Sequence, residues 1–139
     1  MTYWARIFTP IAHKQLKEKY GYDVVYVDSM AGSGVTKTQR VGDYFCGSCP
    51  GAILYAINDG IPFDKVIGVE IDKKKSNVLS KRLTSIRSEM EISIYSKDIL
   101  EVSNQIADEL KSKTIAYIVI DPKGFKGMTW GGNKPTFEL

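Results

Sequence analysis

The sequence contains an apolar strand followed by a glycine-rich loop, Asp23-Val24-Val25-Tyr26-Val27-Asp28 and then Ser29-Met30-Ala31-Gly32-Ser33-Gly34. β-Branched and aromatic residues fill the strand almost without interruption, which is typical of a parallel strand buried on both faces. Glycine tolerates positive φ and has no Cβ, so the loop lets a ligand approach the backbone. A strand that ends in such a turn is the general arrangement of nucleotide-binding units, although a Gly-x-Gly pair alone also occurs in ordinary turns.

Apolar strands and amphipathic helices continue to alternate beyond this segment. Further strands are predicted at 65–71, 91–95 and 114–121, and helices at 50–58, 72–87 and 99–111. This alternation is typical of βαβ units and a parallel sheet. The sequence therefore predicts a single α/β domain over residues 1–139, with a Rossmann-like, mostly parallel sheet of about four strands.

Three other segments fit the alternation less simply. Residues 3–20 have helical periodicity, with Ile7, Ile11 and Leu16 on one face, but Pro10 is expected to break the helix or begin a turn. Residues 36–48 and 124–139, which contain glycine and polar side chains, are expected to be irregular.

Every predicted strand has an acidic side chain at or near its carboxyl end. Asp28, Glu70 and Asp121 lie at the ends of their strands, and Asp98 follows the third strand. Ligands of open parallel sheets bind beyond the carboxyl ends of the strands. Because carboxylates gathered near a cleft cost desolvation energy, this pattern indicates a binding site there.

Glu70 indicates a ribose ligand. An acid at the end of the second strand accepts hydrogen bonds from ribose hydroxyls, the alternative being an ordinary exposed carboxylate. Glu70 lies 36 residues after Gly34, whereas the dinucleotide pattern places the acid about 20 residues on. The next helix is expected only from about Pro50, and a pyrophosphate needs a helix N-terminus at the loop. The sequence therefore argues against NAD and FAD.

Four motifs resemble, in order, those of class I S-adenosylmethionine-dependent methyltransferases; they span residues 27–34, 68–72, 96–99 and 120–125. The loop at 31–34, together with Asp121-Pro122-Lys123-Gly124-Phe125 and Trp130, is more narrowly similar to the three-Cys-motif partner proteins. The resemblance covers about residues 23–130 and implies a seven-stranded Rossmann-like sheet. The chain, with about four strands, is therefore expected to be incomplete at its C-terminus, or completed by self-association or a partner chain.

The resemblance implies S-adenosyl-L-methionine as the cofactor. Asp28 would orient the loop or meet the amino group of the methionine part, for which the loop leaves room. Glu70 would hold the ribose, Asp98 would accept from the adenine amine, and two isoleucines would pack on the adenine. The implied cofactor-binding residues are Asp28, Ala31, Gly32, Ser33, Gly34, Glu70, Ile71, Asp98 and Ile99.

The implied activity is methyl transfer, with a base of DNA or RNA as the favoured acceptor. The catalytic candidates are Asp121, Pro122 and Phe125, and Asp121 would take a proton or hydrogen bond from the acceptor. Enzymes that methylate exocyclic amines of bases usually follow the acid with two prolines and an aromatic residue, whereas Lys123 and Gly124 intervene here. A protein or small-molecule acceptor, a non-catalytic binding or partner subunit, and a plain strand-ending turn at 121–122 remain alternatives.

Composition limits the expected cellular location and partners of the protein. Hydrophobic residues make up 43% and charged residues 25%, as in ordinary soluble chains. Without a membrane-spanning run or a signal peptide, a cytoplasmic protein with no membrane contact is expected. The net charge of +3 permits a nucleic-acid partner without requiring one. No metal is expected, because the single pair Cys46 and Cys49 is too small for structural zinc; ordinary thiols are favoured over a disulfide or a metal shared with another chain.

Overall fold

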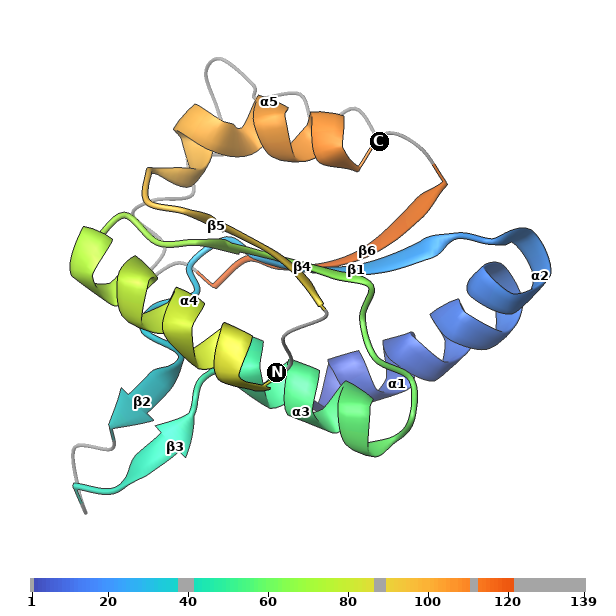
Figure 1. Ribbon diagram of the computed structural model, residues 1–139, viewed down its shortest axis with the longest axis horizontal. Coiled ribbons are helices and arrows are strands. Elements are labelled where there is room, and N and C mark those ends of the chain that lie inside the picture. The colour runs from blue at the N-terminus through green and yellow to red at the C-terminus, as the bar shows by residue number, and fades with distance from the viewer. Residues whose placement is uncertain (1, 38–41, 87–89, 111–112, 122–139) are drawn as a thin grey trace.

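A parallel four-stranded sheet forms the centre of the molecule in a computed structural model, which describes residues 2–37, 42–86, 90–110 and 113–121. Its strand order is β5-β4-β1-β6 (Figure 1). The strands are β1 (Asp23–Asp28), β4 (Lys65–Val69), β5 (Glu91–Tyr95) and β6 (Thr114–Val119). This arrangement confirms the predicted α/β, Rossmann-like fold.

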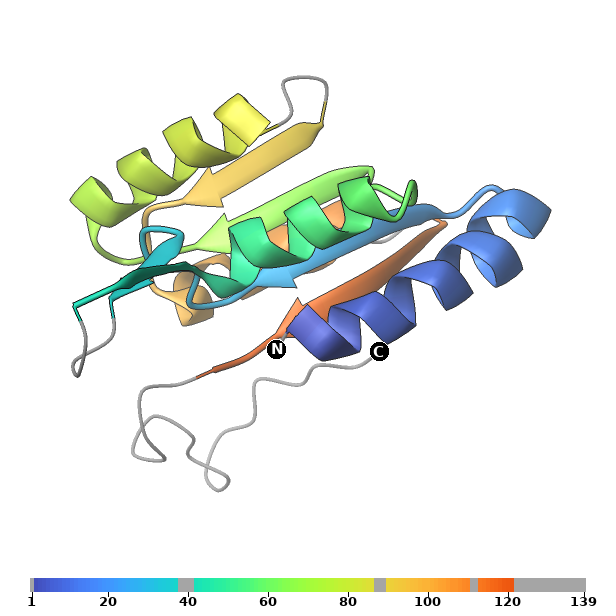
Figure 2. The same ribbon diagram turned by 90° about the horizontal axis from the view of Figure 1, so that it is seen from below.

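Helices cover both faces of the sheet (Figures 1 and 2). On one face lie α3 (Ser48–Asn58), α4 (Lys73–Ile86) and the N-terminal helix, which comprises α1 (Thr2–Ala12), the π-helical turn η1 (His13–Lys17) and α2 (Glu18–Tyr20). On the other face lies α5 (Ile99–Glu109). None of the helices within the described ranges combines the length and apolar character needed to cross a membrane.

Alternate strand residues supply two apolar cores. Val24 and Tyr26 of β1 face the side that carries α1, α3 and α4, whereas Val25 and Val27 face α5. All four side chains are at most 2% exposed, and burying a side chain of this size contributes about 1.5–3 kcal/mol. Burial on both faces is the reason that β1 has an uninterrupted apolar sequence.

The N-terminal helix continues through Pro10, so the predicted break there is wrong. The predicted apolar face is also wrong, because Ile7 and Ile11 are 40% and 58% exposed, while Ala5 and Ala12 are buried against α3. This packing offsets the backbone hydrogen bond that proline cannot donate. The helix widens into the π-helical turn η1 shortly after the proline.

The described part of residues 36–48 contains most of a β-hairpin, so the prediction of an irregular segment is wrong there. Strand β2 (Val35–Lys37) pairs antiparallel with β3 (Tyr44–Cys46). The two ends of the hairpin meet, because Gly47 N donates to Gly34 O at 2.9 Å. Strands of three residues are too short to produce a clear period-two pattern in the sequence.

The strands β4 and β6 both end two residues earlier than predicted, at Val69 and Val119. Glu70 and Asp121 consequently lie in loops beyond the edge of the sheet, where they can turn toward a ligand. In the described part of the chain β6 pairs only with β1; Ile118 within β6 is 41% exposed, and Ile120 directly after it is 55% exposed.

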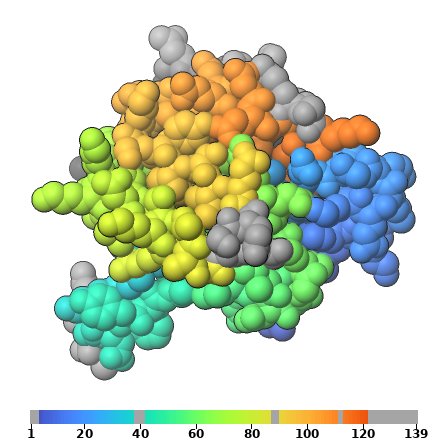
Figure 3. All heavy atoms as spheres, viewed as in Figure 1, coloured from blue at the N-terminus to red at the C-terminus, as the bar shows by residue number. Residues whose placement is uncertain are grey.

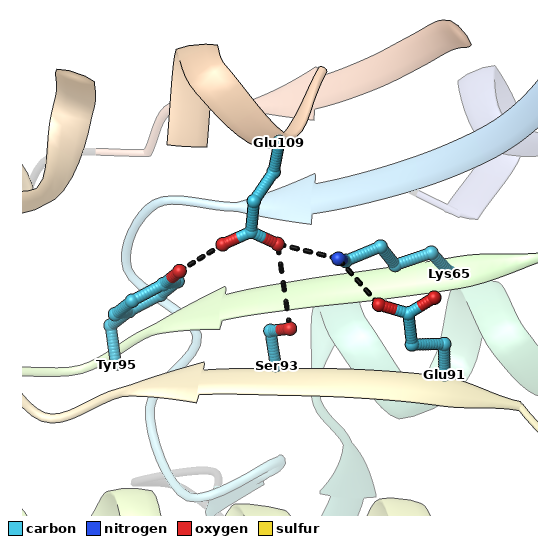
Figure 4. Close-up of polar contacts among 5 residues, drawn as sticks. All are labelled: Lys65, Glu91, Ser93, Tyr95 and Glu109. Carbon is cyan, nitrogen blue, oxygen red and sulfur yellow. Dashed lines mark hydrogen bonds and ion pairs between the residues drawn. The ribbon is translucent and has the colours of Figure 1, made fainter. Parts of the chain in front are cut away.

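A polar network fastens α5 to the sheet (Figure 4). The Glu109 carboxylate accepts from the Tyr95 hydroxyl, from Ser93 Oγ at 3.5 Å and from Lys65 Nζ at 2.6 Å. Lys65 Nζ also pairs with Glu91 at 2.6 Å. Burial acts to raise the pKa of Glu109, but the hydrogen bonds from Lys65 and Tyr95 outweigh it and hold the pKa below its ordinary value of 4.5. The network therefore stabilises the fold when Glu109 is ionised.

Glu109→Gln is expected to lower the free energy of unfolding by about 1–3 kcal/mol at neutral pH, because an amide cannot pair with Lys65. A lowered folded-state pKa means that this contribution exists above the ordinary pKa of the carboxyl and is lost as pH falls through the lowered value. Urea unfolding of both proteins at neutral and acid pH measures the effect. The control is Glu91→Gln, whose side chain is 67% exposed and should contribute less than about 1 kcal/mol. Equal losses in the two variants would contradict this role for Glu109.

Candidate functional site

A cleft of about 970 Å³ opens beyond the carboxyl ends of β1, β4 and β5. Because β4 and β6 lie on opposite sides of β1, this end of the sheet is its topological switch point. Of the nine predicted cofactor-binding residues, all but Asp28 line the cleft. The catalytic candidate Asp121 lines it too, whereas Pro122 and Phe125 lie outside the described residues.

The glycine-rich loop crosses the end of the sheet and forms one wall of the cleft. Ser29 N donates to Val119 O of β6 at 3.0 Å, and Ala31 N donates to Val69 O of β4 at 2.9 Å. The next residue, Gly32, has φ +61°, and a Cβ there would have no atom within 4 Å. The loop is thus tied to two strands while Gly32 presents bare backbone to open space.

Gly34 has a different role from Gly32. Its φ is +80°, and a Cβ at this position would lie 2.9 Å from Pro50 Cγ and 3.0 Å from Leu79 Cδ1. The absence of a side chain therefore makes room for α3 and α4, not for a ligand. Gly34 contributes to the cleft wall through its backbone.

The helix α3 begins beside the glycine-rich loop, since the hairpin that separates them in sequence returns to its starting point at Gly34 and Gly47. The prediction that this helix starts too late to meet the loop is therefore wrong, because a late start in the sequence does not separate the two in the folded chain. Two features still make its N-terminus a poor pyrophosphate site. Pro50 in the first turn has no N–H to donate, and Ser48 is bonded to a carboxylate, that of Asp28.

Asp28 is buried behind the loop and is only 1% exposed. Its carboxylate accepts from Ser48 Oγ at 2.5 Å, from Met30 N at 3.2 Å and from the Tyr26 hydroxyl at 3.4 Å. Burial raises the pKa of Asp28 above 3.8, the hydrogen bonds offset part of the rise, and the charge of Asp121 adds to it. Of its two predicted roles, orienting the loop matches this geometry, because Asp28 binds the loop backbone and does not line the cleft.

Glu70 lines the cleft directly after β4, next to Val69, whose carbonyl binds the loop at Ala31 N. The side chain is half-buried, and Oε1 accepts from Asp72 N at 2.9 Å, which fixes the direction of the carboxylate. Its neighbour Ile71 is 67% exposed and also lines the cleft. Glu70 can therefore offer Oε2 to hydroxyl groups, with an apolar surface beside it.

Asp98 and Asp121 also line the cleft, each at a different place. Asp98 caps α5, where its Oδ1 accepts from Leu100 N at 2.9 Å, and Ile99 beside it also lines the cleft. Asp121 follows β6 and is exposed. Four carboxylates therefore surround or underlie the cleft, as the strand-end pattern predicted.

The hydroxyl of Ser29 is a feature that the sequence did not reveal. Ser29 lines the cleft and is only 5% exposed, and its Oγ has no hydrogen-bond partner among the described residues. A buried hydroxyl without a partner costs about 1–3 kcal/mol. A polar group of a bound ligand would remove this cost.

Both cysteines are free thiols. Cys46 is exposed on β3 and lines the cleft, while Cys49 is buried in α3. Burial, assisted by the charge of Asp28, raises the pKa of Cys49, so this thiol is a poor nucleophile. No group of three metal-ligating side chains occurs in the described ranges.

No protein-family model, curated protein or solved structure matches the chain. Function is therefore inferred from the cleft itself.

Proposed function

We propose that the protein is an S-adenosyl-L-methionine-dependent methyltransferase that acts on a base of DNA or RNA. One observation supports this above all: the open turn at Gly32 and the carboxylate of Glu70, which come from adjacent parallel strands, line one cleft at the switch point of the sheet. A bare backbone and a fixed acceptor that line the same cleft suit an adenosine that carries an amino-acid tail.

The adenosine part would lie along β4 and β5. Glu70 would accept hydrogen bonds from the ribose hydroxyls, and the exposed Ile71 would pack against one face of the adenine. Asp98 and Ile99 would meet the adenine edge. Each of these residues already lines the cleft.

The methionine part would lie along the glycine-rich loop, where Gly32 leaves space and Ser29 has an unsatisfied hydroxyl. The cofactor carries positive charge on its sulfonium and its ammonium group. Asp121 at the cleft and Asp28 behind the loop supply negative charge on this side. These two charges disfavour a pyrophosphate beside the loop, which supports S-adenosylmethionine over NAD or FAD.

When bound, the cofactor supplies an electrophilic methyl group for in-line displacement. The chain would contribute position and charge. Alignment of two reactants can contribute about 7–11 kcal/mol at best. Asp121, exposed two residues beyond β6, would accept a hydrogen bond or proton from the acceptor.

Calorimetry with S-adenosylmethionine tests the proposal. The wild-type protein is expected to bind, and Glu70→Ala is expected to weaken binding about 10–100-fold, because hydrogen bonds to a charged group contribute about 1.5–3 kcal/mol. Glu18→Ala is the matched control, an exposed glutamate on α2, and should leave the affinity unchanged. Wild-type protein that does not bind, or binds no more tightly than Glu70→Ala, would overturn the proposed function.

A further inference from the structure

The β2–β3 hairpin projects from the body of the molecule (Figures 2 and 3), and residues of both its strands line the cleft. Two adjacent aromatic residues of β3 are exposed, Tyr44 by 70% and Phe45 by 55%. A two-stranded hairpin without a packed face gains little stability by itself. Large exposed aromatic side chains on such an element indicate a surface that another molecule covers.

The two faces of the hairpin differ in their relation to the cleft. Lys37 pairs with Tyr44 in the antiparallel register, and the Lys37 ammonium lies 5.5 Å from the centre of the Tyr44 ring. Since side chains alternate along a strand, Val35 and Cys46 share the face of Lys37 and Tyr44, and Val35, Lys37 and Cys46 all line the cleft. Phe45 lies on the opposite face with its pairing partner Thr36, which also lines the cleft. Tyr44 therefore lies on the face that contributes most of the cleft-lining residues of the hairpin.

Three lysines line the same cleft: Lys37 on the hairpin, Lys75 at the start of α4 and Lys97 after β5. All three are exposed, and none forms an ion pair with a carboxylate among the described residues. The acidic residue of the hairpin, Asp43, also lies at its surface. An exposed aromatic ring beside one cation, next to a cleft lined by two more, matches the way proteins hold single-stranded nucleic acid, through base stacking and phosphate contacts.

We propose that the cleft-side face of the hairpin binds single-stranded nucleic acid across the mouth of the cleft. One face of the Tyr44 ring is beside Lys37, and the other stacks on an unpaired base. Lys37, Lys75 and Lys97 meet the phosphates. This inference rests on the proposed function and names its substrate as an unpaired strand, because a base must leave the duplex stack before an enzyme can modify it.

Fluorescence anisotropy with a labelled oligothymidylate of about 16 nucleotides, the upper end of the usual site size, tests the inference. Tyr44→Ala is expected to weaken binding about tenfold, as loss of one stacked base does. Phe45→Ala, the adjacent ring on the opposite face, is the matched control and should change affinity less than about twofold. Lys37→Ala should reduce the slope of log affinity against log salt by about 0.7.

The type of nucleic acid is tested by comparing affinities. An RNA strand of the same length shows whether the protein distinguishes ribose from deoxyribose, and the single DNA and RNA strands should both bind more tightly than a duplex. Wild-type protein that does not bind either strand, or equal losses in Tyr44→Ala and Phe45→Ala, would overturn the inference and favour a protein partner for the hairpin.

Calorimetry with S-adenosylmethionine on the same variants tests the proposed function separately, since Tyr44→Ala should leave the cofactor affinity unchanged. Cofactor binding without strand binding overturns the hairpin inference alone, and strand binding without cofactor binding overturns the methyltransferase proposal alone.

Discussion

Asp28→Ala is expected to lower the free energy of unfolding by about 3–5 kcal/mol, because three donors lose one buried acceptor together. The donors are Ser48 Oγ, Met30 N and the Tyr26 hydroxyl, which bring together α3, the glycine-rich loop and β1. Tyr26 is 1% exposed, so its hydroxyl cannot turn to water instead. Urea unfolding at neutral pH measures the loss.

Asp28→Asn separates the loss of the acceptor from the loss of charge. The amide keeps an acceptor for Met30 N, and the hydroxyls of Ser48 and Tyr26 can rotate to accept from its nitrogen, so the loss should stay below about 1 kcal/mol. Because the pKa of Asp28 is raised in the folded state, the folded protein keeps a proton that the unfolded chain releases. Wild-type stability relative to Asp28→Asn should therefore fall as pH rises from 3.8 to the raised value, and then level off. Equal losses in the alanine and asparagine variants would contradict this role for the carboxylate.

The sheet could be predicted because its two central strands, β1 and β4, are buried on both faces. The continuous apolar sequence of β1 and the similar run of β6 leave no polar face to confuse the pattern. Asp72, which accepts from Lys74 N and Lys75 N, marked the start of α4 in the sequence and in the structure. Local patterns that agree with the tertiary contacts are the ones that sequence reasoning recovers.

The structure differs from the sequence-based predictions where tertiary packing outweighs a local signal. Pro10 should end a helix by its own chemistry, yet buried Ala5 and Ala12 hold that helix against α3. The hairpin brings Gly34 to Gly47 through a hydrogen bond that sequence spacing cannot reveal. The number of residues between the loop and α3 therefore gave a wrong prediction of how close they lie in space.

The sequence predicted which residues belong to the candidate site better than it predicted what each of them does. Residue type and position at strand ends place Glu70, Asp98 and Asp121 around one cleft. Roles depend on contacts that appear only in three dimensions: Asp28 is a buried acceptor, and Ser29 has an unsatisfied hydroxyl. Neither burial nor hydrogen-bond partners of a loop residue can be derived from its neighbours in sequence.

Gly34→Ala is expected to lower the free energy of unfolding by about 2–5 kcal/mol, the sum of two effects. A non-glycine residue at φ +80° costs about 1–2 kcal/mol. The added methyl group would also lie 2.9 Å from Pro50 Cγ and 3.0 Å from Leu79 Cδ1, and such overpacking costs about 1–3 kcal/mol. The proline ring is rigid, and Leu79 is 0% exposed, so its side chain cannot turn into solvent to make room.

Gly32→Ala isolates the backbone effect, because Gly32 shares the loop and has φ +61° but no atom within 4 Å of its Cβ position. Its loss should be about 1–2 kcal/mol, from conformation alone. Urea unfolding of the two variants under one condition gives the packing effect at Gly34 as the difference between them. Equal losses would mean that Pro50 and Leu79 move aside freely, and that the closure of α3 and α4 over the loop does not depend on the missing side chain of Gly34.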